Sequence, residues 1–285
     1  MDDPQLDRWA GWLLHGRHRG AGKAEVRRKA SSLRRVRERV LRGAQIRPGH
    51  RVLDVGAGTG LLATGARRRC DPAGRVVAID LSVDALRVCR DEDTGVEVVA
   101  GDATALPFPD ATFDVAVARS VLIYVRDKDA ALEELYRVLR EGGRVSIFEP
   151  INREYCPRGS WPGDLDEDVA ARYAAVRGHL ERGWEFAHSM RGFDERDLVR
   201  LLRATGFGRI ELTYEYRYSA DGVPSKGEIA DLLMARPNPG MQSHEEAARE
   251  VFGDEAEDYL ERLSAVLSSR PLRESSGAAY IVATR

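Results

Sequence analysis

Short apolar runs alternate along the chain with longer stretches in which apolar residues recur every three to four positions. The short runs predict seven β-strands, at residues 51–55, 75–79, 96–100, 113–118, 144–149, 209–218 and 278–284. The longer stretches predict α-helices at residues 5–15, 24–44, 61–70, 129–139, 194–205 and 243–267. Strands and helices that alternate in this way are typical of the α/β class with a doubly wound, mostly parallel sheet.

Three segments depart from this alternation. Residues 1–47 precede the first strand and predict a pair of helices, so we divide the chain into that segment and a core at residues 48–285. Within the core, residues 151–191 and 219–274 interrupt the pattern and predict an inserted helical region over the strand ends, where it would form the acceptor pocket. The first insertion is rich in aromatic residues, which suit a flat or apolar ligand but are equally common in ordinary packing: Tyr155, Trp161, Tyr173, Trp184 and Phe186.

A glycine-rich turn joins the first strand of the core to its first helix. Residues 52–60 run from an apolar strand through Asp54 to Gly56, Gly58 and Gly60. Glycine permits backbone conformations and close approaches that a Cβ atom would block, and the N–H groups at a helix start are unpaired. The turn therefore predicts a cradle in which polar cofactor atoms lie almost against the backbone.

The spacing of these glycines separates two classes of cofactor. A dinucleotide fingerprint reads G-x-G-x-x-G, whereas this chain has G-x-G-x-G, with Leu61 where the fingerprint has its third glycine. Together with Asp54, the stretch resembles motif I of the class I S-adenosylmethionine (SAM)-dependent methyltransferases. The resemblance implies that the acid and the glycines hold the methionine part of SAM.

A second acid follows the second strand. Asp80 stands about 20 residues beyond the glycines, where a doubly wound fold places a carboxylate on the ribose hydroxyls of a nucleoside cofactor. NAD and SAM both fit this position, and a helix N-cap is the structural alternative. With the resemblance to motif I, we expect Asp80 and its neighbour Leu81 beside the nucleoside of SAM.

The segment after the third strand carries the most specific pattern. Residues 101–114 read G-D-A-T-A-L-P-F-P-D-A-T-F-D, which resembles small-molecule methyltransferases related to the ubiquinone and menaquinone biosynthesis enzymes. The resemblance implies that the Asp102 carboxylate accepts hydrogen bonds from the adenine amine and that the Ala103 backbone N–H donates to the ring. The alternative role of Asp102 is to cap a turn.

The ends of the fourth and fifth strands extend the resemblance. Arg119 and Ser120 follow the fourth strand, where an open sheet binds its ligands, and residues 139–149 resemble the family's L-x-P-G-G turn and fifth strand, with Glu141 in place of the proline. Relatives often have a histidine near Ser120, which this chain lacks. The family fold ends on a reversed seventh strand, so we expect residues 278–284 to run antiparallel beside the fifth strand.

Composition limits the expected binding partners and cellular location of the protein. The 285 residues carry a formal net charge of -2, which gives no net attraction to nucleic acid or to an anionic membrane. The three cysteines contain no C-x-x-C pair, so we expect neither a disulfide framework nor a metal site. No signal-peptide pattern and no long apolar run is present. We therefore expect a cytoplasmic protein.

Basic residues far outnumber acidic ones between His15 and Arg47. A solvated helix face explains this charge, and contact with a phosphate or with RNA is the alternative. The resemblance implies that the two N-terminal helices form a lid over the SAM pocket, which would place Trp9, Trp12, His15 and His18 near the site.

The predicted function is SAM-dependent methyl transfer to a small-molecule acceptor, which leaves S-adenosylhomocysteine. Such a transfer depends on positioning and water exclusion more than on a catalytic group. Candidates for a base are Tyr124, Tyr155, His179 and His188. The alternatives are an RNA-directed methyltransferase, a noncatalytic SAM-binding module and an NAD-dependent oxidoreductase, of which the last fails on the glycine spacing.

Overall fold

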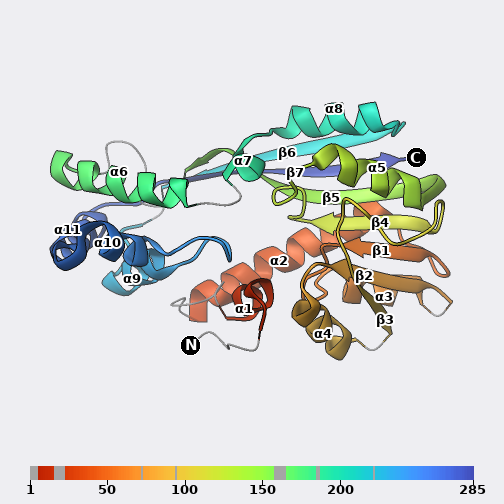
Figure 1. The fold of residues 1–285 in the computed structure, drawn as a ribbon, viewed down its shortest axis with the longest axis horizontal. Helices are drawn as coiled ribbons and strands as arrows, with labels where there is room; N and C mark the ends of the chain where they lie inside the picture. The colour runs from red at the N-terminus through yellow and green to blue at the C-terminus, as the bar shows by residue number, and fades with distance from the viewer. Residues whose placement is uncertain are drawn as a thin grey trace.

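The computed structural model describes residues 6–15, 23–71, 73–93, 95–156, 165–183, 187–220 and 222–285. These residues form a seven-stranded sheet in the order β3-β2-β1-β4-β5-β7-β6 (Figure 1). Strand β7 runs antiparallel to both of its neighbours, β5 and β6, whereas the other pairs are parallel. The reversed strand beside β5 confirms the predicted topology. The strands are β1 (Arg51–Val55), β2 (Arg75–Asp80), β3 (Val96–Ala100), β4 (Phe113–Arg119), β5 (Leu139–Cys156), β6 (Ile210–Ser219) and β7 (Glu274–Thr284).

Both faces of the sheet are covered by helices, as a doubly wound fold requires. Leu53 and Val55 of β1 pack in one apolar cluster with α5 and α8, and Val52 packs on the opposite face with α2, α3 and α4. Successive residues of a strand point to opposite faces, so burial on both sides explains the continuous apolar strand sequences. The helices concerned are α2 (Lys23–Ala44), α3 (Ala63–Cys70), α4 (Val83–Glu92), α5 (Lys128–Val138) and α8 (Glu195–Thr205).

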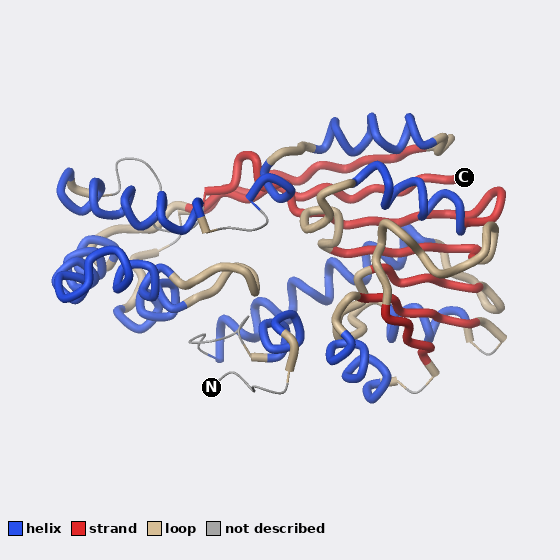
Figure 2. Tube along the Cα trace, in the orientation of Figure 1, coloured by secondary structure: helices blue, strands red, loops and turns tan. Residues whose placement is uncertain are grey.

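The two insertions in the core form a group of helices that we call the helical lobe. Its members are α6 (Glu167–Arg182), α9 (Lys226–Met234), α10 (His244–Phe252) and α11 (Ala256–Leu267). A separate apolar cluster, with Val176, Ile229 and Leu263 among its buried residues, holds these helices together. Figure 2 shows the lobe beyond the end of the sheet at which β5 finishes, the end that binds ligands in open α/β sheets.

The structure corrects several predicted boundaries. Helices α6 and α9 were not predicted, and β5 is longer than residues 144–149. The predicted helix at residues 243–267 is divided by a 3-10 turn, η2 (Gly253–Glu255), because Gly253 adopts a φ of 54° that ends α10. Helix α3 begins two residues later than predicted, since Leu61 and Leu62 belong to the turn. Within the described ranges, no helix has both the length and the apolar character that crossing a bilayer requires.

The N-terminal segment is divided between the site and the core. Helix α1 (Arg8–Leu14) lies near the sheet end that faces the lobe (Figure 1). The second half of α2 is part of the core instead, because Val40 and Leu41 are buried and the Ser146 hydroxyl donates to the Val40 carbonyl at 2.8 Å. Of the described N-terminal residues, α1 and the first half of α2 lie outside this packing, and their role as a lid stays a prediction.

Candidate functional site

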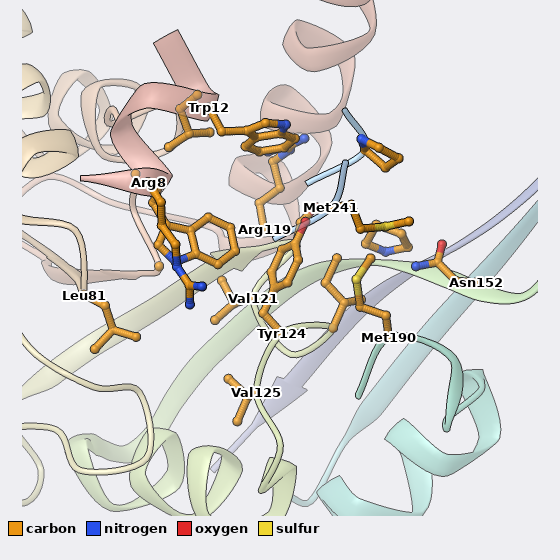
Figure 3. Close-up of a pocket in the computed structure, with 18 of the residues that line it drawn as sticks. Arg8, Trp12, Leu81, Arg119, Val121, Tyr124, Val125, Asn152, Met190 and Met241 are labelled. Atoms are coloured by element: carbon orange, nitrogen blue, oxygen red, sulfur yellow. The ribbon is translucent and has the colours of Figure 1, made fainter. Parts of the chain in front are cut away.

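A cavity of about 1120 Å³ lies between the glycine turn, α1 and the helical lobe. Figure 3 shows Leu81 on one side of this cavity, Asn152 and Met241 on the other, and Tyr124 between them. Residues from the carboxyl ends of β1, β2, β4 and β5 line it, together with residues of α1, α6, α9 and α10. The cavity thus occupies the position at which an open α/β sheet binds its ligand.

The glycine turn forms a wall of the cavity that only glycine can form. Gly56, Gly58 and Gly60 have φ angles of 64°, 52° and 87°, which L side chains rarely adopt. A Cβ on Gly56 would lie 2.4 Å from Val121, and one on Gly58 would lie 3.1 Å from Leu13 of α1. Gly56 and Gly58 line the cavity, whereas Gly60 is buried against α4. The close approach to a ligand therefore belongs to the first two glycines, and the third packs the turn onto the fold.

Asp54 is buried at the base of this turn. Within the described part of the chain its Oδ2 atom has no hydrogen-bond partner. Burial raises the pKa of Asp54 to about 8, with a contribution from the charge of Asp80, while the Ala63 backbone N–H and the Arg119 guanidinium act in the opposite direction. Asp54 is not among the described residues that line the cavity, whereas Val55 and Gly56, which follow it, are. A buried carboxyl oxygen without a donor behind this turn fits a ligand that carries positive charge, as SAM does on its ammonium and sulfonium groups.

Asp80 connects the glycine turn to the start of α4. Its carboxylate accepts hydrogen bonds from the backbone N–H groups of Gly58 at 2.7 Å and Ser82 at 2.8 Å. Ser82 provides the N-cap of α4, so Asp80 does not have the alternative role considered above. Asp80 and the largely exposed Leu81 both line the cavity, and a carboxylate that accepts two hydrogen bonds can accept more.

Asp102 and Ala103 line the same cavity at the end of β3. The Asp102 carboxylate is exposed and accepts hydrogen bonds from the backbone N–H and the hydroxyl of Thr104, each at 2.8 Å. Asp102 therefore caps a turn and faces the cavity at the same time. The two predicted roles of this residue do not exclude each other.

A buried acid on β5 fixes the wall that follows β4. The Glu149 carboxylate accepts hydrogen bonds from three successive backbone N–H groups, at 2.9, 3.0 and 3.2 Å, those of Val121, Leu122 and Ile123. Burial raises the pKa of Glu149 to about 7. Ser120, which precedes this turn, has a left-handed φ of 56°, and both Arg119 and Ser120 line the cavity as predicted from their place after β4.

Helix α1 contacts both sides of the cavity. The hydroxyl of Ser82 donates to the Asp7 carboxylate at 2.7 Å, which joins α1 to α4. The indole of Trp9 packs edge-on against Tyr124 with ring centroids 4.8 Å apart. Trp12 donates from Nε1 to a backbone carbonyl of the loop after α9 at 2.9 Å. Together with Leu13 over the glycine turn, these contacts place α1 between the turn and the helical lobe.

The four predicted base candidates have different places in the structure. Tyr124 and Tyr155 line the cavity. His179 and His188 are not among its described lining residues, since His179 lies 3.2 Å from Gln242 and His188 is exposed. His15 is exposed at the end of α1. The remaining candidates from the sequence, His18, Trp161, Trp184 and Phe186, lie outside the described residues.

Sequence analysis did not identify His244, the first residue of α10, as a site residue. Its ring lines the cavity, lies 2.7 Å from the Tyr259 hydroxyl through Nε2 and stacks on Tyr173. Burial lowers the pKa of His244 to about 4, and the Arg177 charge acts in the same direction. The sequence did carry a signal for the start of this helix, because Ser243 and the acid three residues later form a capping box.

Known proteins share both the sequence pattern and the fold. Residues 53–147 match the family model described as a methyltransferase domain. The ubiquinone/menaquinone biosynthesis C-methyltransferase UbiE of Cupriavidus pinatubonensis is 35% identical over 183 residues, which cover 59% of this chain and 71% of that protein. The demethylmenaquinone methyltransferase of Streptomyces avermitilis is 34% identical over 176 residues, 61% of this chain and 75% of that protein. The UbiE enzyme of Xanthomonas campestris is 45% identical over 112 residues, which span 37% of this chain and 44% of its own.

Solved structures agree on the fold. The YcgJ protein of Bacillus subtilis has a TM-score of 0.52 at 21% identity, over 90% of this chain and 98% of its own. A chain from the Haloferax volcanii complex of the Trm112 methyltransferase activator has a TM-score of 0.53 at 15% identity, over 99% of both chains. The chain therefore belongs to the class I SAM-dependent methyltransferases of the UbiE type, enzymes that use S-adenosylmethionine to methylate small molecules.

Proposed function

We propose that this methyltransferase transfers a methyl group from SAM to a carbon of an aromatic small molecule of the quinol class. The relatives named above are enzymes of ubiquinone and menaquinone biosynthesis. The observation that carries the proposal is the continuous cavity, which joins the glycine turn to a chamber lined by Trp9, Tyr124, Tyr155 and Met190. Aromatic and thioether side chains suit a flat acceptor ring.

The proposed SAM site follows from the fit of charges and hydrogen-bonding groups. Asp54 and the glycine turn suit the charged methionine part, the remaining acceptor capacity of Asp80 suits the ribose hydroxyls, and the Asp102 segment suits the adenine. When bound, SAM supplies a methyl group already attached to a leaving group. The residues proposed to hold it are Asp54, Gly56, Gly58, Asp80, Leu81, Asp102, Ala103, Arg119 and Ser120, with Gly60 packing the turn against α4 behind them.

The chain itself contributes the position of the reactants. Helix α1 and the helical lobe line the acceptor chamber, while Glu149 holds the turn that carries Val121 and Tyr124 in place. Holding two reactants in line at contact distance lowers a barrier by roughly 7 to 11 kcal/mol in favourable cases. Tyr124 and Tyr155 are the predicted base candidates that reach the cavity, and their role stays a prediction.

The test is a transfer assay with methyl-labelled SAM and a panel of water-soluble hydroquinones. We expect label in the organic phase and a product heavier by one methylene unit, with the new methyl on a ring carbon by NMR. SAM binding without transfer to any hydroquinone would remove the quinol acceptor. Transfer to oxygen or nitrogen of another acceptor would replace it with a different chemistry.

RNA-directed methylation remains the second candidate because of the basic face of α2. Two of these cations are already paired with acids, Arg39 with Glu215 and Arg37 with Glu38, which disfavours a phosphate-binding face. Retention of the protein on immobilised RNA that weakens steeply with salt would support this candidate. A cytoplasmic location stays a prediction of the sequence.

A further inference from the structure

The helical lobe brings a histidine and two tyrosines to the wall of the acceptor chamber. The ring of His244 stacks on Tyr173 of α6, with centroids 4.9 Å apart and an interplanar angle of 22°. Its Nε2 atom lies 2.7 Å from the hydroxyl of Tyr259 on α11, and Tyr259 is fully buried in the lobe core. Three helices thus fix the ring in one orientation.

One ring nitrogen of His244 is not engaged by the residues that hold the ring. Nε2 is engaged by Tyr259, and Nδ1 has no hydrogen-bond partner in the part of the chain that the structure describes. Nδ1 is not among the fully buried polar atoms that lack a partner, while the residue lines the cavity. His244 therefore brings to the cavity wall a ring with one nitrogen that is neither fully buried nor engaged by another described residue.

The chemistry of this nitrogen selects a class of ligand group. Burial and the nearby Arg177 charge lower the pKa of His244, so its ring is neutral at physiological pH. A neutral imidazole whose Nε2 is held by a hydroxyl presents either a donor or an acceptor at Nδ1, according to the tautomer. Both forms pair with an oxygen on an aromatic ring, the donor with a carbonyl and the acceptor with a hydroxyl.

We propose that His244 binds an oxygen substituent of the methyl acceptor through Nδ1, with Tyr259 as the positioning residue and Tyr173 as the wall behind the ring. The proposal rests on the proposed function, since it assigns a recognition group to the acceptor end of the same cavity. It places acceptor selectivity in the helical lobe and SAM binding in the glycine turn. Substitutions in the lobe should then change acceptor use without changing SAM affinity.

Two substitutions of His244 separate the cavity contact from the structural contact. The amide of His244→Asn lies near the position of Nδ1, so this variant keeps a polar group at that place but does not reach Tyr259. The amide of His244→Gln lies near the position of Nε2, so this variant keeps the contact to Tyr259 but has no polar group in place of Nδ1. We expect His244→Gln to raise the KM for 1,4-naphthohydroquinone about tenfold, and His244→Asn to raise it less. SAM affinity by calorimetry should be unchanged in both, and His188→Gln is the matched control on an exposed histidine outside the cavity.

Binding of simple probes keeps this test independent of methyl transfer. The wild type should bind 1-naphthol more tightly than naphthalene, and His244→Gln should lose that preference. An unchanged preference in a folded His244→Gln protein, or a larger loss in His244→Asn, would overturn the proposal. If the preference depends on His244 but no hydroquinone is methylated, the oxygen contact stands and the quinol acceptor fails.

Discussion

The Glu149 carboxylate accepts a hydrogen bond from the Val121 backbone N–H at 2.9 Å, and the Val121 side chain fills the space that a Cβ on Gly56 would enter. This buried acid of β5 therefore sets the position of the wall against which the glycine turn packs. Because Glu149 is fully buried and touches only backbone donors in this turn, its effect on the site should be visible through stability as well as activity.

We expect Glu149→Gln to flatten the pH dependence of stability between pH 4.5 and pH 7. The pKa of Glu149 is raised by burial from 4.5 to about 7, so the folded protein keeps a proton that the unfolded chain has released. The stabilisation from this retained proton is fully present below pH 4.5 and is lost as the pH rises through 7. The effect is at most roughly 3 kcal/mol. Urea unfolding at both pH values measures it, with Glu211→Gln on the surface as control, and an unchanged slope would contradict the assignment.

His244→Gln should remove a pH dependence of stability of the opposite sign, between pH 4 and pH 6.5. Burial lowers the pKa of His244 from 6.5 to about 4. Between these pH values the ring is therefore protonated in the unfolded chain and neutral in the folded protein. This contribution is present above pH 6.5 and is lost as the pH falls through 4. The variant should therefore lose less stability than the wild type on acidification, as measured by unfolding at pH 7 and pH 4.5. A steeper loss in the variant would show that the ring is charged in the folded protein.

Gly58→Ala should abolish SAM binding at a modest cost in stability. Both Gly58 and the control Gly142 have a left-handed φ, 52° and 73°, so an alanine at either position costs about 1 to 2 kcal/mol. A Cβ on Gly142 meets open space, whereas one on Gly58 enters the cavity 3.1 Å from Leu13. Thermal unfolding and calorimetry measure the two effects. Equal SAM affinity in the two variants would mean that no ligand approaches Gly58.

Asp7→Asn should loosen the closure of α1 over the site. The asparagine still caps α1, but one oxygen that accepts from the Ser82 hydroxyl becomes a donor. We expect the KM for SAM to rise about three- to tenfold while the melting temperature changes little. Asp166→Asn alters the N-cap of α6 in the same way and should leave the KM unchanged. Equal KM values for the Asp7 variant and the wild type would exclude the lid.

The sheet and the residues of the proposed SAM site were predictable because their signals are local. Apolar strands that end on an acid or a glycine identify Asp54, Asp80 and Asp102, and the order of strands and helices gives the topology. The roles of Asp7 and Glu149 were not predictable, since each depends on partners that are distant in sequence: Asp7 meets a hydroxyl 75 residues away, and Glu149 caps a turn more than 25 residues away.

The helical lobe was predicted only in part, since the sequence predicted one helix over residues 243–267, where α10 and α11 lie, but neither α6 nor α9. Its core forms between α6 and helices that follow about 50 or more residues later, so neither segment shows a complete apolar face alone. The Ser225 capping box marked the start of α9, and the spacing of Val169, Tyr173 and Val176 was typical of a helix. The position of His244 in the cavity follows only from the packing of these helices.

The most direct test of the central claim is a calorimetric titration of SAM into the wild type and Asp80→Asn. Asparagine can still accept from a backbone N–H but loses the charge-assisted bonds to ribose hydroxyls. We predict measurable binding by the wild type, about tenfold weaker binding by Asp80→Asn, and no change in Asp110→Asn, which alters an acid outside the cavity. Equal affinity of Asp80→Asn and the wild type would contradict the proposed position of SAM in this cavity.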